Sequence, residues 1–284
     1  MSRVPLTRKG FDAMRVSVIH TADDIVREHI VNKSVVMFDI LRASSTISTA
    51  LANGCQEVIP VVEVDEALAI ASRLPEDTCI LGGERSAVKL PGFHLGNSPL
   101  EYTPEVVAHK TVILTTTNGT KAIRRAAGED GVVLIGSLLN YSAVAHKLFA
   151  AEQDILLACA GTRGKFSLED TFAAGLVVAE LVQLWYSRHN AAPEESCSPQ
   201  ADPVPIYAEE VPVLPENGLL LEDAAVAALR LAEAYRHKPL RALYDALHGQ
   251  KLAQMGLSID LNFCAQLNLY DVVPVYREGK ITCL

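Results

Sequence analysis

Hydroxyl, amide and glycine residues follow an apolar run in the segment TVILTTTNGTKAIR, at residues 111–124. Such residues at the end of a buried strand suit anion binding, because their side chains and backbone N–H groups donate hydrogen bonds to anionic oxygens. Gly119 permits a turn with positive φ and a close approach of the backbone to a ligand. The side-chain donors here are Thr115, Thr116, Thr117, Asn118 and Thr120, and Lys121 adds a positive charge. The alternative is an ordinary helix N-cap, for which Thr and Asn are well suited.

A carboxylate and a guanidinium lie three positions apart in FDILRASST, at residues 38–46. Asp39 closes an apolar run in which a carboxylate would be costly to bury, so we expect it to project from the strand end. With Arg42 and the two serines that follow, it indicates an acid–cation pair above an anion-accepting turn. The alternative is a structural salt bridge between Asp39 and Arg42 next to a Ser/Thr helix cap. The DxDx[TV] motif of haloacid-dehalogenase phosphatases is excluded, because Leu41 stands where the second Asp is required.

The segment GGERSAVKLPGFHLGNSP, at residues 82–99, is dense in turn residues and predicts a long loop over the same edge of the sheet. Glu84 is a candidate metal ligand. Arg85 is a candidate ligand of a carboxylate or phosphate, through its bidentate fork. His94 is a candidate acid or base, with an ordinary exposed loop histidine as the alternative.

The segment ILLACAGTRGKFSLED, at residues 155–170, places Cys159 at a strand end. A cysteine-dependent phosphatase requires Cys-x5-Arg, but the sixth residue after Cys159 is Lys165, so we interpret Cys159 as a small buried residue. Glu169 and Asp170 open a long helix, where acids also favour the helix dipole. Four acids are therefore expected near one crevice: Asp39, Glu84, Glu169 and Asp170. Their carboxylate oxygens are the hard ligands that Mg²⁺ prefers.

Continuous apolar strands alternate with amphipathic helical patterns along the chain. The expected strands are residues 16–19, 34–40, 57–62, 78–83, 111–116, 131–137, 154–160 and 271–276. Helical patterns cover 45–54, 65–74, 120–128, 140–150, 169–188 and 220–248. This alternation predicts an α/β fold with a mostly parallel sheet covered by helices on both faces. Ligands of such a sheet bind beyond the carboxyl ends of its strands, which is where the polar segments lie.

The chain is predicted to form one domain over residues 14–284, preceded by an N-terminal tail at 1–13. The composition changes at about 189–217, where six prolines occur without helical periodicity. Because helical patterning resumes afterwards, we interpret this proline-rich segment as an insertion within the domain.

The charge balance limits the classes of partner. The 34 acidic residues exceed the 25 basic ones, which gives a net charge of −9 and argues against broad binding to nucleic acid or anionic membranes. An uninterrupted apolar run of 18 residues is absent, so no transmembrane helix is expected. The six cysteines form no CxxC pair, which gives no support to a zinc site. A cytoplasmic protein is expected, and the size and acidity of the chain favour a homodimer.

Six motifs in order along the chain resemble the 2-phosphosulfolactate phosphatase family, also called the ComB family. They are DILRASSTISTALANG, GGERSAVKLPGFHLGNSPLEY, TTTNGTKAI, GSLLNYSAVA, CAGTRGKFSLEDTFAAG and DLNFCAQLNLYDVVPVY. The resemblance implies a three-layer α/β/α, ComB-like fold. It also implies a Mg²⁺-dependent phosphatase that converts 2-phospho-3-sulfolactate, a small polyanionic substrate, to 3-sulfolactate and phosphate in coenzyme M biosynthesis.

Together these patterns give each candidate residue a role. The expected catalytic residues are Asp39, Arg42, Asn118 and Thr120, and the expected metal ligands, direct or through water, are Asp39, Glu84, Glu169 and Asp170. The expected substrate-binding residues are Ser44, Ser45, Arg85, Asn97, Ser98, Thr116, Thr117, Gly119, Lys121 and Arg163. The attacking group is either a metal-bound hydroxide or a side chain, for which Asp39 is the candidate. Asp260, Asn262 and Cys264 either complete the pocket or pack the last strand. A non-catalytic anion-binding module on the same fold is the alternative function.

Overall fold

The computed structural model describes residues 13–75, 77–128, 131–190 and 218–284. Within these residues one eleven-stranded sheet runs through the molecule in the order β5-β4-β6-β3-β11-β10-β7-β2-β8-β1-β9. Six of its ten neighbouring strand pairs are parallel, which confirms the mostly parallel sheet. The strands are β1 Met14–Ile19, β2 Ser34–Phe38, β3 Glu57–Val61, β4 Cys79–Arg85, β5 Val88–Lys89, β6 Thr111–Thr115, β7 Val133–Gly136, β8 Ile155–Cys159, β9 Leu219–Leu221, β10 Pro274–Arg277 and β11 Lys280–Cys283.

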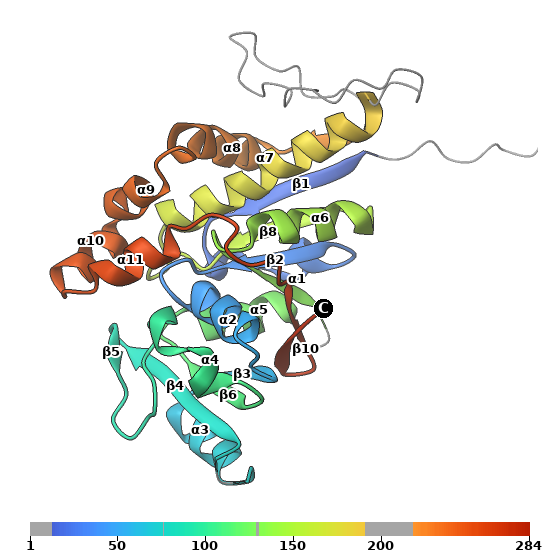
Figure 1. The fold of residues 1–284 in the computed structure, drawn as a ribbon. Helices are drawn as coiled ribbons and strands as arrows, with labels where there is room; N and C mark the ends of the chain where they lie inside the picture. Colours follow the sequence, from blue (N-terminus) through green and yellow to red (C-terminus); the bar gives the residue numbers. More distant parts are fainter. Residues whose placement is uncertain (1–12, 76, 129–130, 191–217) are drawn as a thin grey trace, which may run out of the picture.

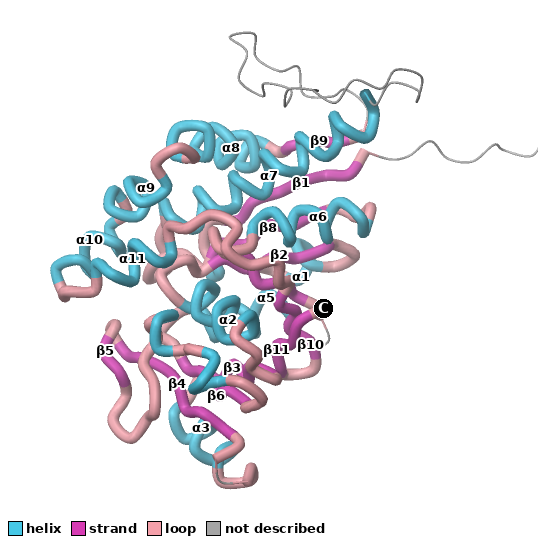
Figure 2. Tube along the Cα trace, viewed as in Figure 1, coloured by secondary structure: helices cyan, strands magenta, loops and turns pink. Residues whose placement is uncertain are grey.

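Helices connect most of these strands (Figure 2). The α-helices are α1 Arg27–Ile30, α2 Ala43–Ala52, α3 Val64–Ala71, α4 Pro104–Val107, α5 Gly119–Ala127, α6 Tyr141–Ala151, α7 Leu168–Asn190, α8 Asp223–Tyr235, α9 Pro239–Asp245, α10 Leu247–Gln254 and α11 Ser258–Cys264. Two 3-10 turns, η1 Ala22–Asp24 and η2 Pro99–Glu101, complete the described elements.

Helices cover both faces of the sheet, which confirms the three-layer α/β/α fold. Successive residues of a strand point to opposite faces, and β2 shows this clearly. Val36 packs in one core with residues of α6, α7 and α8, whereas Met37 packs in a second core with residues of α2 and α5. Both side chains are fully buried, as expected for a strand covered on its two faces.

The sheet consists of two parallel blocks joined by an antiparallel hairpin. β4, β6 and β3 form one block, β7, β2, β8, β1 and β9 form the other, and the β10–β11 hairpin pairs antiparallel with both. Three successive antiparallel pairings therefore reverse the strand sense between the blocks. Five pairings separate β2 from β6, so a twist of roughly 20° per pair turns the blocks strongly relative to each other. As a result the carboxyl ends of β2 and β4 lie on the same side of the molecule, near α10 and α11 (Figure 1).

Most expected elements are present, and the missed ones are short or lie late in the chain. The seven earliest expected strands correspond to β1 to β4 and β6 to β8, and the last corresponds to β10. The expected helical stretch 220–248 begins with strand β9 and is then divided into α8, α9 and the start of α10. Pro239 begins α9, as expected of a residue that cannot continue the preceding helix.

The N-terminal tail at 1–12 and most of the proline-rich segment lie outside the described residues. Helix α7 continues to Asn190, so residues 189 and 190 are helical rather than part of an irregular insertion. Gly54 and Gly128 follow α2 and α5 with positive φ of 86° and 61°. The sequence pattern predicts a left-handed helix-ending glycine at both positions, but at Gly128 ψ is −142°, outside the left-handed helical region.

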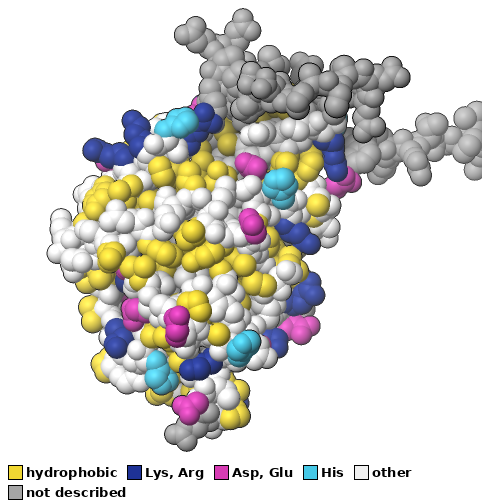
Figure 3. Space-filling view, in the orientation of Figure 1, with side chains coloured by type: hydrophobic (Ala, Val, Ile, Leu, Met, Phe, Trp, Pro, Cys, Tyr) yellow, Lys and Arg dark blue, Asp and Glu magenta, His cyan; other side chains and the backbone are white. Residues whose placement is uncertain are grey.

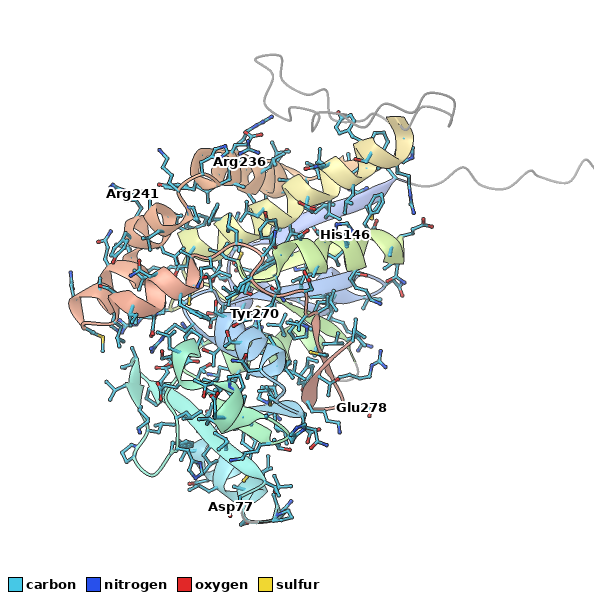
Figure 4. The ribbon with its side chains drawn as sticks, in the orientation of Figure 1. Asp77, His146, Arg236, Arg241, Tyr270 and Glu278 are labelled. Carbon is cyan, nitrogen blue, oxygen red and sulfur yellow. The ribbon has the colours of Figure 1, made fainter. Side chains whose placement is uncertain are left out.

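The segment between α11 and β10 carries the labelled Tyr270 and passes between α2 and α6 in this view (Figure 4). Its backbone is held to the β7–α6 connection. The Tyr270 N–H donates to the Leu139 carbonyl, and the Asn268 N–H donates to the Leu138 carbonyl, both at 2.9 Å. The C-terminal part of the chain is thereby fixed above the sheet edge that carries the polar segments.

Charged side chains of both signs are spread over the face of the molecule in Figure 3, with apolar residues between them. The acidic excess of the sequence is therefore not gathered into one patch on this face. Among the described helices, none combines the length and the apolar character that crossing a membrane requires.

Gly175 allows α7 and α8 to pack closely. A Cβ at this position would lie 1.9 Å from the Ala228 carbonyl oxygen and 3.0 Å from the Ala232 Cβ. We expect Gly175→Ala to lower the free energy of unfolding by about 1–3 kcal/mol through overpacking, although alanine favours a helix by about 1 kcal/mol. Urea denaturation followed by circular dichroism measures the change.

Ser187→Ala is the matched control, because Ser187 is an exposed position on the same helix. It should change the free energy of unfolding by no more than about 0.5 kcal/mol. Equal stability of Gly175→Ala and the wild type would contradict the tight packing of the two helices.

Candidate active site

A cavity of about 360 Å³ lies where the polar segments meet. Eight of the expected site residues line it: Asp39, Arg42, Glu84, Asn97, Thr116, Thr117, Asn118 and Arg163. They come from the ends of β2, β4, β6 and β8 and, for Asn97, from the loop after β5, all distant in sequence. The polar strand ends thus share one cavity, as the sequence predicted.

The amino end of α5 touches the Asp39 carboxylate. A Cβ at Gly119 would lie 2.6 Å from Asp39 Oδ2 and 2.5 Å from the Ala43 Cβ, so only glycine fits between α5 and α2. The backbone does come close to other groups here, but these are Asp39 and Ala43 rather than a ligand. The expected positive φ is wrong, since Gly119 begins α5 and is not among the glycines with positive φ. Its role is to leave room rather than to turn the chain.

The carboxylate partner of Arg42 is Asp260. The Arg42 Nη1 lies 2.7 Å from Asp260 Oδ2, and both side chains are almost fully buried. The expected pairing of Arg42 with Asp39 is therefore wrong, because α11 supplies a carboxylate at a more buried position. Ser98 Oγ donates to the other Asp260 oxygen at 2.5 Å. Asp260 thus supports the pocket wall. Cys264 is instead buried in the core, and Asn262 Nδ2 donates to the Ser258 carbonyl.

Both oxygens of Glu84 accept hydrogen bonds from the protein. Oε1 accepts from the Thr117 N–H at 2.7 Å, and Oε2 accepts from the Ala87 N–H at 2.6 Å and the Thr117 hydroxyl at 3.1 Å. Glu84 therefore joins the end of β4 to the β6–α5 loop. It lines the cavity but has little capacity left for direct ligation.

Asp170 and Glu169 are buried beside the same cavity. Asp170 Oδ1 accepts the Ile40 N–H at 2.8 Å and Oδ2 accepts the Gly161 N–H at 3.2 Å, so this residue joins the ends of β2 and β8. Burial raises the pKa of both carboxyl groups, and the Glu169 charge raises that of Asp170 further. Within the described residues, no group of three or more His, Cys, Asp or Glu side chains is placed to hold a metal ion. The four acids are therefore close without forming one direct ligand shell.

Asp39 is the partly exposed carboxylate of the cavity. Burial, followed by the charges of Glu84 and Glu169, raises its pKa from 3.8 to about 7, against the opposing effects of the Ala43 backbone and Arg42. Its backbone N–H donates to Ser44 Oγ at 2.7 Å, which fixes the strand end. A carboxylate that lies close to other negative charges and opens to the cavity is suited to bind a cation or a proton.

Several expected catalytic or substrate-binding residues instead hold the loops in place. Thr116 and Thr120 exchange hydrogen bonds between their hydroxyls and backbone N–H groups at 3.1 and 3.3 Å, and Thr120 is fully buried. Ser45 Oγ donates to the Ile40 carbonyl at 2.9 Å. Arg85 donates to the Val62 carbonyl and Thr115 Oγ1, and it is not among the residues that line the cavity. These contacts give all four residues a supporting role, and of the four only Thr116 also lines the cavity.

Helix α10 contributes two residues that sequence reasoning missed, His248 and Lys251. Burial and the charges of Arg42 and Lys251 lower the pKa of His248 to about 4, so it is neutral at pH 7. Its Nδ1 lies 3.8 Å from Glu169 Oε1. The i, i+3 spacing puts both residues on one helix face, which is the signal that could have indicated them. His94 is not in the cavity, since its Nδ1 accepts the Leu81 N–H at 2.9 Å.

Asp39→Asn should raise the melting temperature of the metal-free protein at pH 8. The raised pKa means that the folded state binds a proton more tightly than the unfolded state. The stabilisation from Asp39 is thus complete below about pH 4 and is lost as the pH rises to about 7. An uncharged Asn avoids this loss, so we expect a gain of at least roughly 2 °C at pH 8. Differential scanning calorimetry in EDTA measures it.

The same variant should show a smaller gain at pH 5, where the folded protein carries a neutral Asp39. A gain of equal size at both pH values, or a lower melting temperature at pH 8, would show that repulsion at Asp39 is not what destabilises the site.

Comparison with known proteins agrees with this geometry. The sequence profile of the 2-phosphosulpholactate phosphatase family matches residues 19–279. The chain is 39% identical over 257 residues to the probable 2-phosphosulfolactate phosphatase of Symbiobacterium thermophilum, covering 90% of this chain and 97% of that relative. It is 37% identical over 270 residues to the protein of the same name from Clostridium beijerinckii, covering 95% of this chain and all of the relative. The chain therefore belongs to the 2-phosphosulpholactate phosphatase family, a family of phosphoric monoester hydrolases.

Proposed function

We propose that this protein is a Mg²⁺-dependent phosphatase that hydrolyses 2-phospho-3-sulfolactate, or a related small hydroxy-acid phosphate, to the hydroxy acid and phosphate. The observation that carries the proposal is the position of Asp39. Its crowded carboxylate lines a cavity that also holds the amino end of α5 and three cations, Arg42, Arg163 and Lys251. A carboxylate next to groups that attract a phosphoryl group is the arrangement that metal-assisted hydrolysis requires.

The donor set fits a hard divalent cation. The Asn97 Oδ1 is a buried side-chain oxygen without a hydrogen-bond partner among the described residues, and Asn97 lines the cavity together with Asp39. An unpaired amide oxygen and a repelled carboxylate are oxygen ligands of the kind that Mg²⁺ binds, usually with several waters. We therefore assign Asp39 and Asn97 as its protein ligands, with Glu84, Glu169 and Asp170 adding negative charge around them. When bound, the ion would neutralise charge on the phosphoryl oxygens.

The chain's own residues would position the ester. Asn118 precedes α5 as its N-cap residue and makes no side-chain capping hydrogen bond, so its amide is available to the phosphoryl oxygens together with the positive end of the helix dipole. Lys251 adds charge from α10. Arg42 is less free, because Asp260 fixes its guanidinium, and it acts as a rigid part of the wall. One Asp39 oxygen would accept the proton of the attacking water while the oxygen of that water bonds to phosphorus. The ester oxygen would leave with the bonding electrons and take up a proton to become the hydroxyl group of the product.

Phosphate release from 2-phospho-3-sulfolactate tests the proposal. Wild-type protein should release phosphate with Mg²⁺, lose the activity in EDTA and regain it when Mg²⁺ is restored. Asp39→Asn should reduce kcat by roughly 10²-fold or more, because it removes both a ligand and a proton acceptor. A malachite-green assay measures each rate.

Asp77→Asn is the matched control, since it changes an exposed Asp that precedes β4, at the opposite end of that strand from Glu84 (Figure 4). It should retain wild-type turnover. If the substrate raises the melting temperature of the wild type but is not turned over at any Mg²⁺ concentration, this result would contradict the proposed enzymatic function. It would support an anion-binding module.

A further inference from the structure

A second cavity of about 380 Å³ adjoins the first. The two share Thr117, Asn118 and Arg163 in their walls, so a molecule in one can extend into the other. The other walls of this side cavity come from η1, α5 and the β8–α7 loop. Lys121 lines only the side cavity, which corrects the expectation that it sits with the other substrate-binding residues in one pocket.

The cations around the two cavities differ in whether another group of the protein already pairs with them. Arg42 is paired with Asp260, and Arg125 with Asp23 at 3.1 Å. Lys121, Arg163 and Lys251 make no side-chain hydrogen bond or ion pair to any other residue that the structure describes. These unpaired cations lie on α5, the β8–α7 loop and α10, so they surround the joined cavities from three sides.

The side cavity favours an anion, although one of the residues that line it is a carboxylate. Its one carboxylate, Asp23, faces Arg125, whose guanidinium also donates to the Asp23 carbonyl at 2.7 Å. This pairing leaves Lys121 and Arg163 without a counter-charge in the wall. Backbone hydrogen bonds between Thr162 and Lys165, at 3.0 and 3.2 Å, close the turn that carries Arg163 at the shared edge.

We propose that the side cavity binds a second acidic group of the substrate, a carboxylate or sulfonate on the carbon chain next to the phosphate ester. Lys121 and Arg163 neutralise this group, while the phosphoryl group lies in the main cavity with Asp39 and Lys251. This assignment rests on the proposed phosphatase function. It makes Lys121 a specificity residue, because Lys121 contacts only the part of the substrate that does not react.

Three two-carbon substrates that differ in one group test the assignment. They are ethyl phosphate with a neutral tail, phosphoglycolate with a carboxylate, and the phosphate ester of 2-hydroxyethanesulfonate with a sulfonate. Wild-type protein should prefer one or both acidic esters in kcat/KM, and the preferred ester identifies the group that the cavity holds. Lys121→Gln should raise KM for the preferred ester about tenfold, equivalent to about 1.4 kcal/mol of binding. It should lower kcat/KM for ethyl phosphate by much less, because this ester carries no acidic group for the side cavity.

Lys121→Arg should recover most of the preference, because it restores the charge at the same position. Lys165→Gln is the matched control. Lys165 is an exposed cation on the same loop as Arg163 but lines neither cavity, so its loss should change no KM.

Two results would overturn the assignment. One is an equal loss by Lys121→Gln on all three esters, which would place the phosphoryl group at Lys121. The other is an unchanged preference in Lys121→Gln, which would mean that this lysine is simply solvated. Absence of turnover by the wild type on these esters and on 2-phospho-3-sulfolactate would instead contradict the phosphatase function itself.

Discussion

The contact between the amino end of α5 and the Asp39 carboxylate is the constraint on which the rest of the site depends. In the sheet, β2 and β6 are separated by five strand pairings, and three of these reverse the strand sense. Their ends meet because Gly119 has no side chain, which leaves α2 and α5 in contact through Ala43 and Asp39. Any larger residue would separate the two blocks of the sheet at the point where their polar ends share a cavity.

This contact brings charges together that the protein does not neutralise itself. Asp39 is near Glu84 and Glu169, and their mutual repulsion opposes the ionisation of its carboxyl group. The cation nearest in sequence, Arg42, is fixed on Asp260 instead. Glu84 and Asp170 are satisfied by backbone N–H groups, which holds the loops still and leaves Asp39 facing the cavity. The repulsion around Asp39 is thereby left for a bound ligand to offset, which is what the proposed Mg²⁺ ion would do.

The sequence predicted the features that local patterns control. Buried parallel strands are nearly continuous apolar runs, so the strand ends at Asp39 and Thr115 could be located, and so could the sharing of one cavity. The partner of Arg42 could not be predicted, because Asp260 is 218 residues away in sequence whereas Asp39 is only three positions away. A sequence pattern gives the charges and their spacing. It does not show which buried carboxylate faces a given guanidinium in the folded chain. The reversal of the sheet was missed for the same reason, since the β10–β11 hairpin inserts between strands that precede it by more than 100 residues.

The late part of the chain therefore completes a site that the early part only outlines. The hairpin joins the two blocks at the centre of the sheet, and α10 and α11 add Lys251, His248 and the Asp260 carboxylate that fixes Arg42. The Arg42–Asp260 contact alone joins residues 218 positions apart, and such long-range pairings form only after a large loss of chain entropy. Because the same long-range contacts hold the sheet together and shape the cavity, the arrangement of the acids around Asp39 depends on the whole domain and not on any one motif.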